Sequence, residues 1–357
     1  MNTFWQKLQP KADQPRAGSI PFTVLAPMAN VTDWAFRQVI IETGTSTGLS
    51  VNRPDVFFTE FISADGICAA GREKFKGELY FAENERPIVV QFFSASPEHM
   101  YKCAQLAQEL GFDGIDINMG CPDKSVEKQG AGAALMKDPR LARKIIEETI
   151  RGSGGLPVSV KTRLGFNSID HDWIKHLLDT NITALTIHAR TRKEMSKVPA
   201  HWDELGKVAE IARNIHGSSS THSIPQGSEP VESTGSGRLS TKPLIIGNGD
   251  VANMEDLREK AKTYNLDGIM VGRGIFDNPW FFSGKEVNDP KERISLLLKH
   301  LDNFEKLWLS GGGGKNFDVM KRFFKIYING YPGAKELRAQ LMTTRNKEEV
   351  LAILKNL

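Results

Sequence analysis

The sequence predicts a (β/α)8 barrel followed by a small C-terminal helical domain. Eight short apolar runs recur between residues 22 and 275, and segments of helical periodicity separate them. Alternating strands and helices indicate a parallel sheet with crossover helices, and eight such units in roughly 250 residues indicate a closed barrel. A doubly wound sheet is the alternative, but no G-x-G-x-x-G motif follows the first run. The predicted strands are FTVLAPM (22–28), VFFTEFIS (56–63), PIVVQFF (87–93), GIDINMG (114–120), PVSVKTRLG (157–165), ALTIHAR (184–190), PLIIGNGDV (243–251) and GIMVGRGI (268–275).

The composition is that of a soluble globular protein. The chain has 357 residues, of which 40% are hydrophobic and 25% charged. No apolar run is long enough to span a bilayer, and the N-terminal segment lacks the apolar core of a signal peptide. Three widely spaced cysteines, Cys68, Cys103 and Cys121, indicate neither a disulfide framework nor a zinc site. We therefore expect a cytoplasmic, monomeric protein with no bound metal and no membrane contact.

Two insertions and a glycine-rich segment interrupt the pattern. Residues 43–56 and 216–242 each connect a predicted helix to the next strand, so they should lie at the end of the barrel away from the chemistry. The second insertion is rich in Ser, Gly and Pro and almost free of large apolar residues, which predicts disorder. The segment SGGGGK (310–315) predicts a hinge-like linker.

The chain changes character after residue 288, where helical periodicity replaces the strand–helix alternation. We place a barrel domain at residues 1–288 and a helical domain at 289–357. Residues 290–357 contain 13 basic and seven acidic residues, a surplus typical of a polyanion partner such as RNA, although a solvated helical surface would produce it too. Aromatic residues interleave with the basic ones, and their helical spacing favours core packing over stacking on bases. They are Phe323, Phe324, Tyr327 and Tyr331.

Polar residues lie late in the predicted strands. In a (β/α)8 barrel the C-terminal ends of the strands form the catalytic face, so these side chains should converge at one mouth. Contact of strand ends with water would explain one such residue, but not a set drawn from six strands. The set comprises Gln91, Asn118, Cys121, Lys161, Arg163, His188, Arg190, Asn248, Asp250 and Arg273.

Seven segments carry a family resemblance, in order along the chain. They are LAPMANVTD (25–33), DINMGCP (116–122), KQGAGAALMKDP (128–139), VKTRLG (160–165), IHARTRKEM (187–195), IGNGDV (246–251) and VGRGIFDNPWFF (271–282). Together they resemble the dihydrouridine synthase family, flavin-dependent enzymes that reduce uracil in transfer RNA. The tail segment YINGYPGAKELRAQL also resembles the helical domain of that family. The resemblance runs from about Val24 to the end, apart from the insertions, and implies FMN as cofactor, NADPH or NADH as reductant and tRNA as substrate.

The phosphate of a flavin mononucleotide needs backbone N–H donors. In many barrels these follow the seventh and eighth strands. The pairs Gly249–Asp250 and Gly272–Arg273 occupy these two positions. A single Gly-Arg pair would equally fit a tight turn with an exposed arginine. Both pairs at the expected strand ends favour a phosphate site.

The flavin ring needs a positive charge near N1 and O2, where negative charge develops on reduction. Lys161 fits this need, although a buried lysine at a strand end could instead form a Schiff base, as in aldolases. The resemblance adds Gln91, His188 and Asn248, and the backbone of Pro27 and Met28, as contacts to the cofactor. Taken alone, a strand-end histidine is more often a core residue, and an asparagine before Gly-Asp could merely shape the turn.

Gly-Cys-Pro follows the predicted fourth strand. Reducing the C5–C6 bond of uracil requires a hydride at C6 and a proton at C5, delivered from opposite faces. A thiol pKa of about 8.5 keeps Cys121 mostly protonated at neutral pH, and Pro122 restricts the loop that aims it. The resemblance makes Cys121 the catalytic acid and assigns Asn118 and Arg163 to the uracil edge. The alternative is that Cys121 is simply a small hydrophobic residue in a loop.

One departure concerns the substrate. Many family members place a tyrosine eight residues after the strand-end histidine, and Ser196 stands there in this chain. Three other function classes fit parts of the pattern. A small-molecule enzyme of the dihydroorotate dehydrogenase kind would share the flavin site but not need the basic tail. An aldolase would use Lys161 without flavin, and an RNA-binding protein without chemistry would bind no flavin either.

Overall fold

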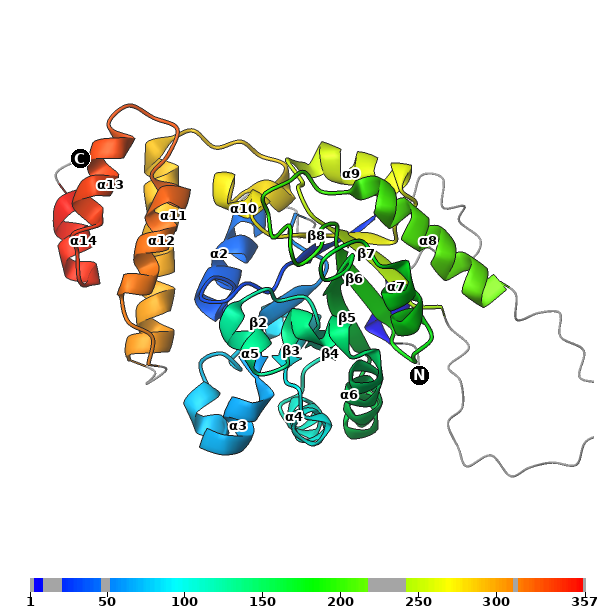
Figure 1. Cartoon of the computed structure of the whole chain (residues 1–357). Helices are drawn as coiled ribbons and strands as arrows, with labels where there is room; N and C mark the ends of the chain where they lie inside the picture. Colours follow the sequence, from blue (N-terminus) through cyan, green and yellow to red (C-terminus); the bar gives the residue numbers. More distant parts are fainter. Residues whose placement is uncertain (1–2, 9–20, 46–51, 218–241, 311–313, 356–357) are drawn as a thin grey trace, which may run out of the picture.

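The computed structural model describes residues 3–8, 21–45, 52–217, 242–310 and 314–355. Eight parallel strands form one sheet in the order β1-β8-β7-β6-β5-β4-β3-β2, and a parallel bridge between Val24 and Val56 joins its two edges. The sheet therefore closes into the predicted (β/α)8 barrel, with the helices outside it (Figure 1). The strands are β1 (Phe22–Leu25), β2 (Phe57–Ser63), β3 (Ile88–Phe93), β4 (Gly114–Asn118), β5 (Val158–Arg163), β6 (Ala184–His188), β7 (Leu244–Asn248) and β8 (Gly268–Val271).

Helices follow the strands, and several begin at residues that cap them. Ser96 accepts the backbone N–H of His99 at 3.3 Å, and Asp138 accepts that of Leu141 at 3.0 Å, each just before a proline at the first helical position. The main helices are α2 (Trp34–Thr45), α3 (Ala64–Ala70), α4 (Pro97–Glu109), α6 (Pro139–Gly152), α7 (His171–Leu178), α8 (Trp202–Gly217) and α9 (Met254–Thr263). Shorter turns are η1 (Arg72–Phe75), η2 (Glu83–Glu85), α5 (Lys124–Lys128), η3 (Gly132–Lys137), α10 (Gly274–Asp277) and η5 (Phe281–Ser283).

Apolar side chains fill the N-terminal half of the barrel interior. Trp5, on the short helix α1 (Phe4–Lys7), is 1% exposed, and its ring lies 5.8 Å from that of Phe22 at the start of β1. Phe4 reaches the start of β4, within 3.1 Å of where a Cβ on Gly114 would lie. Helix α1 thus closes this end of the barrel. The cluster comprises Trp5, Phe22, Val24, Ala26, Val56, Phe58, Val89, Ala184, Leu244, Ile246 and Met270.

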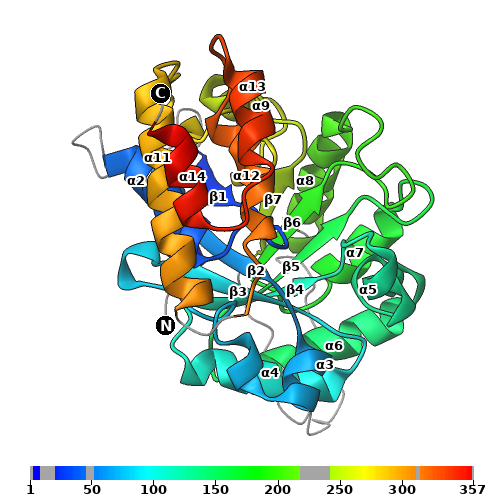
Figure 2. The ribbon, with the colours of Figure 1, turned by 90° about the vertical axis from the view of Figure 1, so that its left-hand side faces the viewer.

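The C-terminal helices pack against one side of the barrel. Figure 2 shows α11 alongside α2. Phe36 of α2 contacts His300 and Phe323 of the tail at ring distances of 5.5 and 5.3 Å. Phe323, Phe324 and Tyr327 are buried, which confirms the core interpretation of these aromatic residues. The tail consists of α11 (Pro290–Phe304), the π-helical turn η6 (Glu305–Leu309), α12 (Asp318–Tyr327), α13 (Ala334–Leu341) and α14 (Lys347–Leu354).

Much of the predicted insertions and linker falls outside the described residues, namely 46–51, 218–241 and 311–313. The second insertion connects α8 to β7, a helix-to-strand connection as predicted. Within the described part of the chain, no helix is both long and apolar enough to cross a membrane. The same residues contain no cluster of three or more His, Cys, Asp or Glu side chains that could hold a metal ion.

Candidate active site

Polar side chains line the C-terminal half of the barrel interior. Residues two apart on a strand face the same side of the sheet. A strand that contributes an apolar side chain to the N-terminal half of the interior therefore contributes a polar one to the C-terminal half. The register places Asn118 beside Lys161, Arg163 beside His188, and His188 beside Asn248. The structure thus brings together the strand-end residues that the sequence predicts to converge.

A hydrogen-bonded chain crosses three strands beneath the mouth. Ser159 Oγ donates to Asp116 Oδ1 at 2.6 Å, and Gln91 Nε2 donates to Asp116 Oδ2 at 2.6 Å. Gln91 Oε1 accepts from Asn118 Nδ2 at 2.9 Å, and Asn118 Oδ1 accepts the N–H of Cys121. Burial raises the pKa of Asp116 to about 6, since a fully enclosed carboxylate loses its hydration. This acceptor fixes which way the Gln91 amide points.

Hydrogen bonds and packing fix the turn that carries Cys121. The Cys121 N–H donates to Asn118 Oδ1 at 2.9 Å, and its carbonyl accepts the N–H of Ala133 at 3.0 Å. Gly132 has a φ of 60°, and a Cβ there would lie 2.9 Å from the Cys121 carbonyl oxygen, so glycine suits the position. Burial raises the pKa of the Cys121 thiol, which keeps it protonated at neutral pH. The half-buried thiol can therefore act as an acid.

Lys161 and His188 both line the C-terminal half of the barrel interior, but at neutral pH the lysine is charged and the histidine is not. Burial, together with the charge of Arg163, lowers the pKa of Lys161 to about 8, so its amine remains cationic at pH 7. Burial and neighbouring cations lower the pKa of His188 well below its usual value, so its imidazole is neutral. His188 Nε2 lies 3.4 Å from Arg190, whereas its Nδ1 is buried with no partner in the described residues. Thr186 Oγ1, two residues earlier on β6, is buried and unpaired as well.

Arg163 holds loops together at the mouth. Its Nε donates to the carbonyl of Gly120 at 2.9 Å, and its Nη1 donates to those of Thr191 and Met195 at 3.2 and 2.9 Å. Burial lowers its pKa to about 10, which leaves it charged at neutral pH. Arg163 thereby links the loop after β4 to the loop after β6. Ser196 is exposed on the second of these loops.

The ends of β7 and β8 form the predicted phosphate region. Asp250 accepts hydrogen bonds from Arg190 and from the N–H of Ala200, and lies 3.6 Å from the 60%-exposed Arg273. The Asp250 carboxylate is therefore paired with two arginines. The backbone of the turn after β7 remains available to contact a ligand. A Cβ at Gly272 would lie 3.7 Å from Met28 Sδ, so the loop after β1 approaches the same region.

Known proteins of one family match nearly the whole of this chain. The family described as dihydrouridine synthase (Dus) matches residues 24–216 and 238–357. The chain belongs to the dihydrouridine synthase family. A probable tRNA-dihydrouridine synthase of Staphylococcus aureus strain COL is 40% identical over 356 residues, covering 98% of this chain and 94% of the relative. Probable tRNA-dihydrouridine synthase 2 of Bacillus subtilis strain 168 is 39% identical over 355 residues, covering 98% and 95%.

Among solved structures, morphinone reductase aligns with a TM-score of 0.49 and 12% identity, covering 76% of this chain and 92% of that chain. In this dihydrouridine synthase family member, the sequence patterns indicate no role for Asp116 or Thr186, and they indicate for Arg190 only a place among the polar residues at the strand ends. The sequence signal for Asp116 is a carboxylate within an otherwise apolar strand. The signal for Arg190 is the position of this arginine at the end of a strand. Nothing in the local sequence distinguishes Thr186.

Proposed function

We propose that this chain is an FMN-dependent tRNA-dihydrouridine synthase, which reduces the C5–C6 bond of specific uridines with NADPH, or NADH, as reductant. The placement of Cys121 carries the proposal: a half-buried, protonated thiol stands at the mouth of a barrel half that contains Lys161 and His188. Family membership and two relatives that match nearly the whole chain support the same activity.

The residues present fit a flavin. Within the part of the chain that the structure describes, the buried atoms His188 Nδ1 and Thr186 Oγ1 have no hydrogen-bond partner, and a polar ligand could supply one. Lys161 supplies a cation for the ring edge, and Gln91 an amide fixed by Asp116. Once bound and reduced by NADPH or NADH, FMN would supply the hydride that C6 of uracil receives. The full cofactor assignment is Pro27, Met28, Gln91, Lys161, His188, Asn248, Gly249, Asp250, Gly272 and Arg273.

Cys121 is the proposed acid. It gives its thiol proton to C5 of uracil as C6 gains the hydride, so two C–H bonds replace the C5–C6 π bond, and the thiolate regains a proton from water. Asn118 and Arg163 are assigned to the uracil edge. Asn118 Nδ2 donates one of its two hydrogens to Gln91. The hydrogen bonds of Arg163 within the described chain use Nε and Nη1, so Nη2 remains for substrate.

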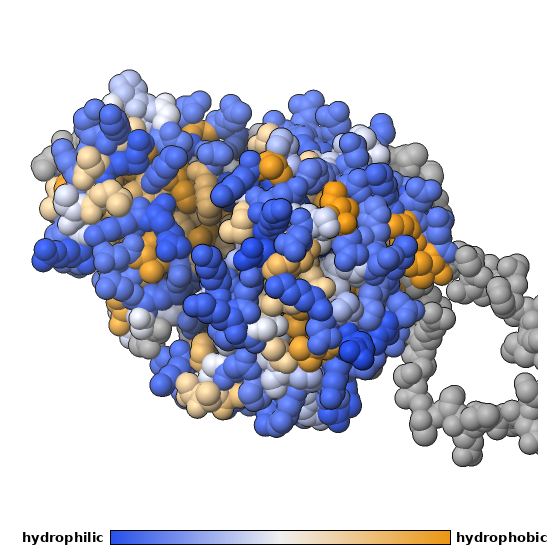
Figure 3. Space-filling model, in the orientation of Figure 1, coloured by the Kyte–Doolittle hydropathy of each residue, from blue (hydrophilic) through white to orange (hydrophobic). Residues whose placement is uncertain are grey.

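The tail is the proposed RNA-binding domain of an enzyme that acts as a cytoplasmic monomer. A cavity of 910 Å³ lies between the ends of β7 and β8 and helix α12. Figure 3 shows hydrophobic residues exposed between the tail and the barrel, on a surface that is otherwise largely hydrophilic. Cationic side chains among the cavity's lining residues could meet RNA phosphates. Apart from Arg273, which is assigned to the flavin, they are Lys260, Arg322 and Lys325.

The test combines colour and product. Protein purified with FMN should be yellow, and with NADPH it should form dihydrouridine in tRNA taken from a strain that lacks the gene. Nucleoside analysis of that tRNA measures the product, and a parallel reaction with NADH ranks the two reductants. Turnover of dihydroorotate without activity on tRNA would favour the small-molecule enzyme. Failure to bind FMN would contradict the proposal.

A further inference from the structure

Lys315 of the tail reaches into the barrel between two carboxylates. Its Nζ lies 2.5 Å from Glu60 Oε2 and 3.2 Å from Asp33 Oδ2, and 4.1 Å from the centre of the Trp308 ring. The Lys315 side chain is 10% exposed, and the two carboxylates are 5% and 2% exposed. Trp308, also from the tail, donates its Nε1–H to Asp33 at 2.8 Å. Two tail side chains therefore end on one buried aspartate of the barrel.

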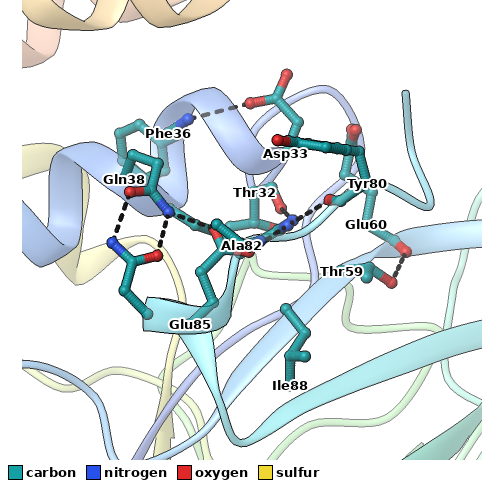
Figure 4. Close-up of polar contacts among 12 residues, drawn as sticks. Thr32, Asp33, Phe36, Gln38, Thr59, Glu60, Tyr80, Ala82, Glu85 and Ile88 are labelled. Atoms are coloured by element: carbon teal, nitrogen blue, oxygen red, sulfur yellow. Dashed lines mark hydrogen bonds and ion pairs between the residues drawn. The ribbon is translucent and has the colours of Figure 1, made fainter. Parts of the chain in front are cut away.

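Both carboxylates hold the loop at 26–33, between β1 and α2. Asp33 Oδ1 accepts the N–H of Phe36 at 3.1 Å, which caps the start of α2. Glu60, on β2, accepts the N–H of Asn30, whose φ of 55° is left-handed. Figure 4 shows Asp33 and Glu60 close together beside Thr32. The position of this loop thus depends on both carboxylates.

A second polar cluster, between α2 and the η2 turn, fixes the end of the same loop. Arg37 donates to the carbonyl of Thr32 at 2.8 Å and forms an ion pair of 3.0 Å with Glu85, with both side chains fully buried. Thr32 Oγ1 in turn accepts the N–H of Met28 at 2.8 Å. Figure 4 shows Thr32, Tyr80 and Glu85 gathered in this cluster. Met28 is thus held through Thr32, and the next residue, Asp33, belongs to the site that Lys315 enters, so both clusters act on the same loop.

The lysine favours the charged form of Glu60. Two buried carboxylates in one site repel each other, and a cation between them reduces this repulsion. Burial raises the pKa of Glu60 to about 7, although the Lys315 charge opposes the rise. Lys315 therefore increases the anionic share of Glu60, and an anionic carboxylate accepts a stronger hydrogen bond from Asn30 than a neutral acid would.

We propose that Lys315 is a positioning residue through which the tail sets the loop at 26–33, and hence the flavin site that this loop borders. This inference rests on the proposed function, because that function assigns the backbone of Pro27 and Met28 to the flavin. Its consequence is that the RNA-binding tail and the flavin site form one unit. A change confined to the tail should therefore alter flavin binding as well as RNA binding.

The experiment compares two lysines of the tail in the full-length protein. Lys315→Met should weaken FMN binding roughly tenfold, a size typical of coupling between sites, as measured by flavin fluorescence titration. Lys347→Met is the matched control: Lys347 also contacts two carboxylates, Asp302 and Glu305 at 2.7 Å each, but within the tail. The control should leave FMN affinity unchanged. Adding Glu60→Gln to Lys315→Met removes the unpaired charge and should restore part of the lost affinity.

A second variant reaches the same site from the barrel side. A Cβ at Gly77 would lie 2.3 Å from the Trp308 ring, so Gly77→Ala should displace Trp308 and also weaken FMN binding. Wild-type FMN affinity in both Lys315→Met and Gly77→Ala would overturn the inference, even if tRNA binding fell. Failure of the wild-type protein to bind FMN would instead reject the proposed function, so the two failures are distinguishable.

Discussion

The two halves of the barrel interior come from the same strands but have different properties. In the N-terminal half, Trp5 and Phe22 belong to a closed apolar cluster. In the C-terminal half, burial shifts the pKa of Asp116 upward to about 6 and that of Lys161 downward to about 8. Such shifts mean that folding disfavours the charged forms, which costs stability. The N-terminal half therefore stabilises the barrel, whereas the C-terminal half lowers its stability because it buries ionisable groups that the chemistry needs.

The largest expected effect belongs to the polar half. Cys121→Ala should leave FMN bound and its reduction by NADPH nearly intact, but slow the reduction of tRNA by about 10²–10⁴-fold, the usual size of general acid catalysis. Single-turnover assays with pre-reduced enzyme isolate this step. Cys121→Ser should also be slow, because a hydroxyl is a much weaker acid than a thiol. Cys68→Ala is the control, since Cys68 is exposed on α3.

The wild-type rate of tRNA reduction in Cys121→Ala would remove the thiol from the mechanism. The Gly-Cys-Pro turn would then be a structural feature, held by Asn118 and Gly132 for packing alone. Loss of FMN from the same variant would contradict the prediction in another way, because it would show that Cys121 is needed for cofactor binding as well as for proton transfer.

The apolar half should respond in stability rather than in chemistry. Trp5→Ala removes a side chain that is 1% exposed and leaves a cavity at the closed end, which should cost about 3–5 kcal/mol of unfolding free energy. Urea unfolding of the apo-protein measures this. The folded fraction should keep its rate of tRNA reduction per bound flavin. A slower chemical step at unchanged stability would show that the two halves are not independent.

An intermediate effect is expected at the rim. Arg273→Ala should weaken FMN binding by about 1.5–3 kcal/mol, because it removes a charge-assisted contact to the phosphate. Titration of apo-protein with FMN measures the change. Lys262→Ala, an exposed charge on the nearby helix α9, is the control. Equal affinities for wild type and Arg273→Ala would place the phosphate elsewhere.

The smallest expected effect is a pH dependence. Because the pKa of Lys161 is lowered to about 8, its cation is present at pH 7 and lost as pH rises through that value. FMN affinity should therefore fall above pH 8, by up to about tenfold, which corresponds to one pKa unit of differential interaction. Lys161→Met should bind FMN more weakly at pH 7 and show no such decline. A wild-type affinity that stays constant to pH 9 would mean that Lys161 does not face the cofactor.

The sequence by itself determined the barrel, the helical tail and the strand ends at which the polar residues gather. These features follow from local rules: period-two alternation, helical periodicity, and the position of a residue along its strand. The same rules predicted that Cys121 would follow a strand, and that the aromatic residues of the tail, such as Phe323, would lie in a core. They also placed Asn118, Lys161 and His188 at one end of parallel strands.

Only the tertiary structure decided which of these groups meet. Asp116 reads locally as part of an apolar strand, and its partners Gln91 and Ser159 lie on neighbouring strands. The local sequence suggests that the Arg163 guanidinium is free, yet it donates hydrogen bonds to carbonyls of the loops after β4 and β6. Lys315 reads as part of a flexible linker, yet its carboxylate partners are more than 250 residues away in sequence. Such pairings depend on barrel closure and on the docking of the tail, which bring side chains within hydrogen-bonding distance regardless of their local periodicity.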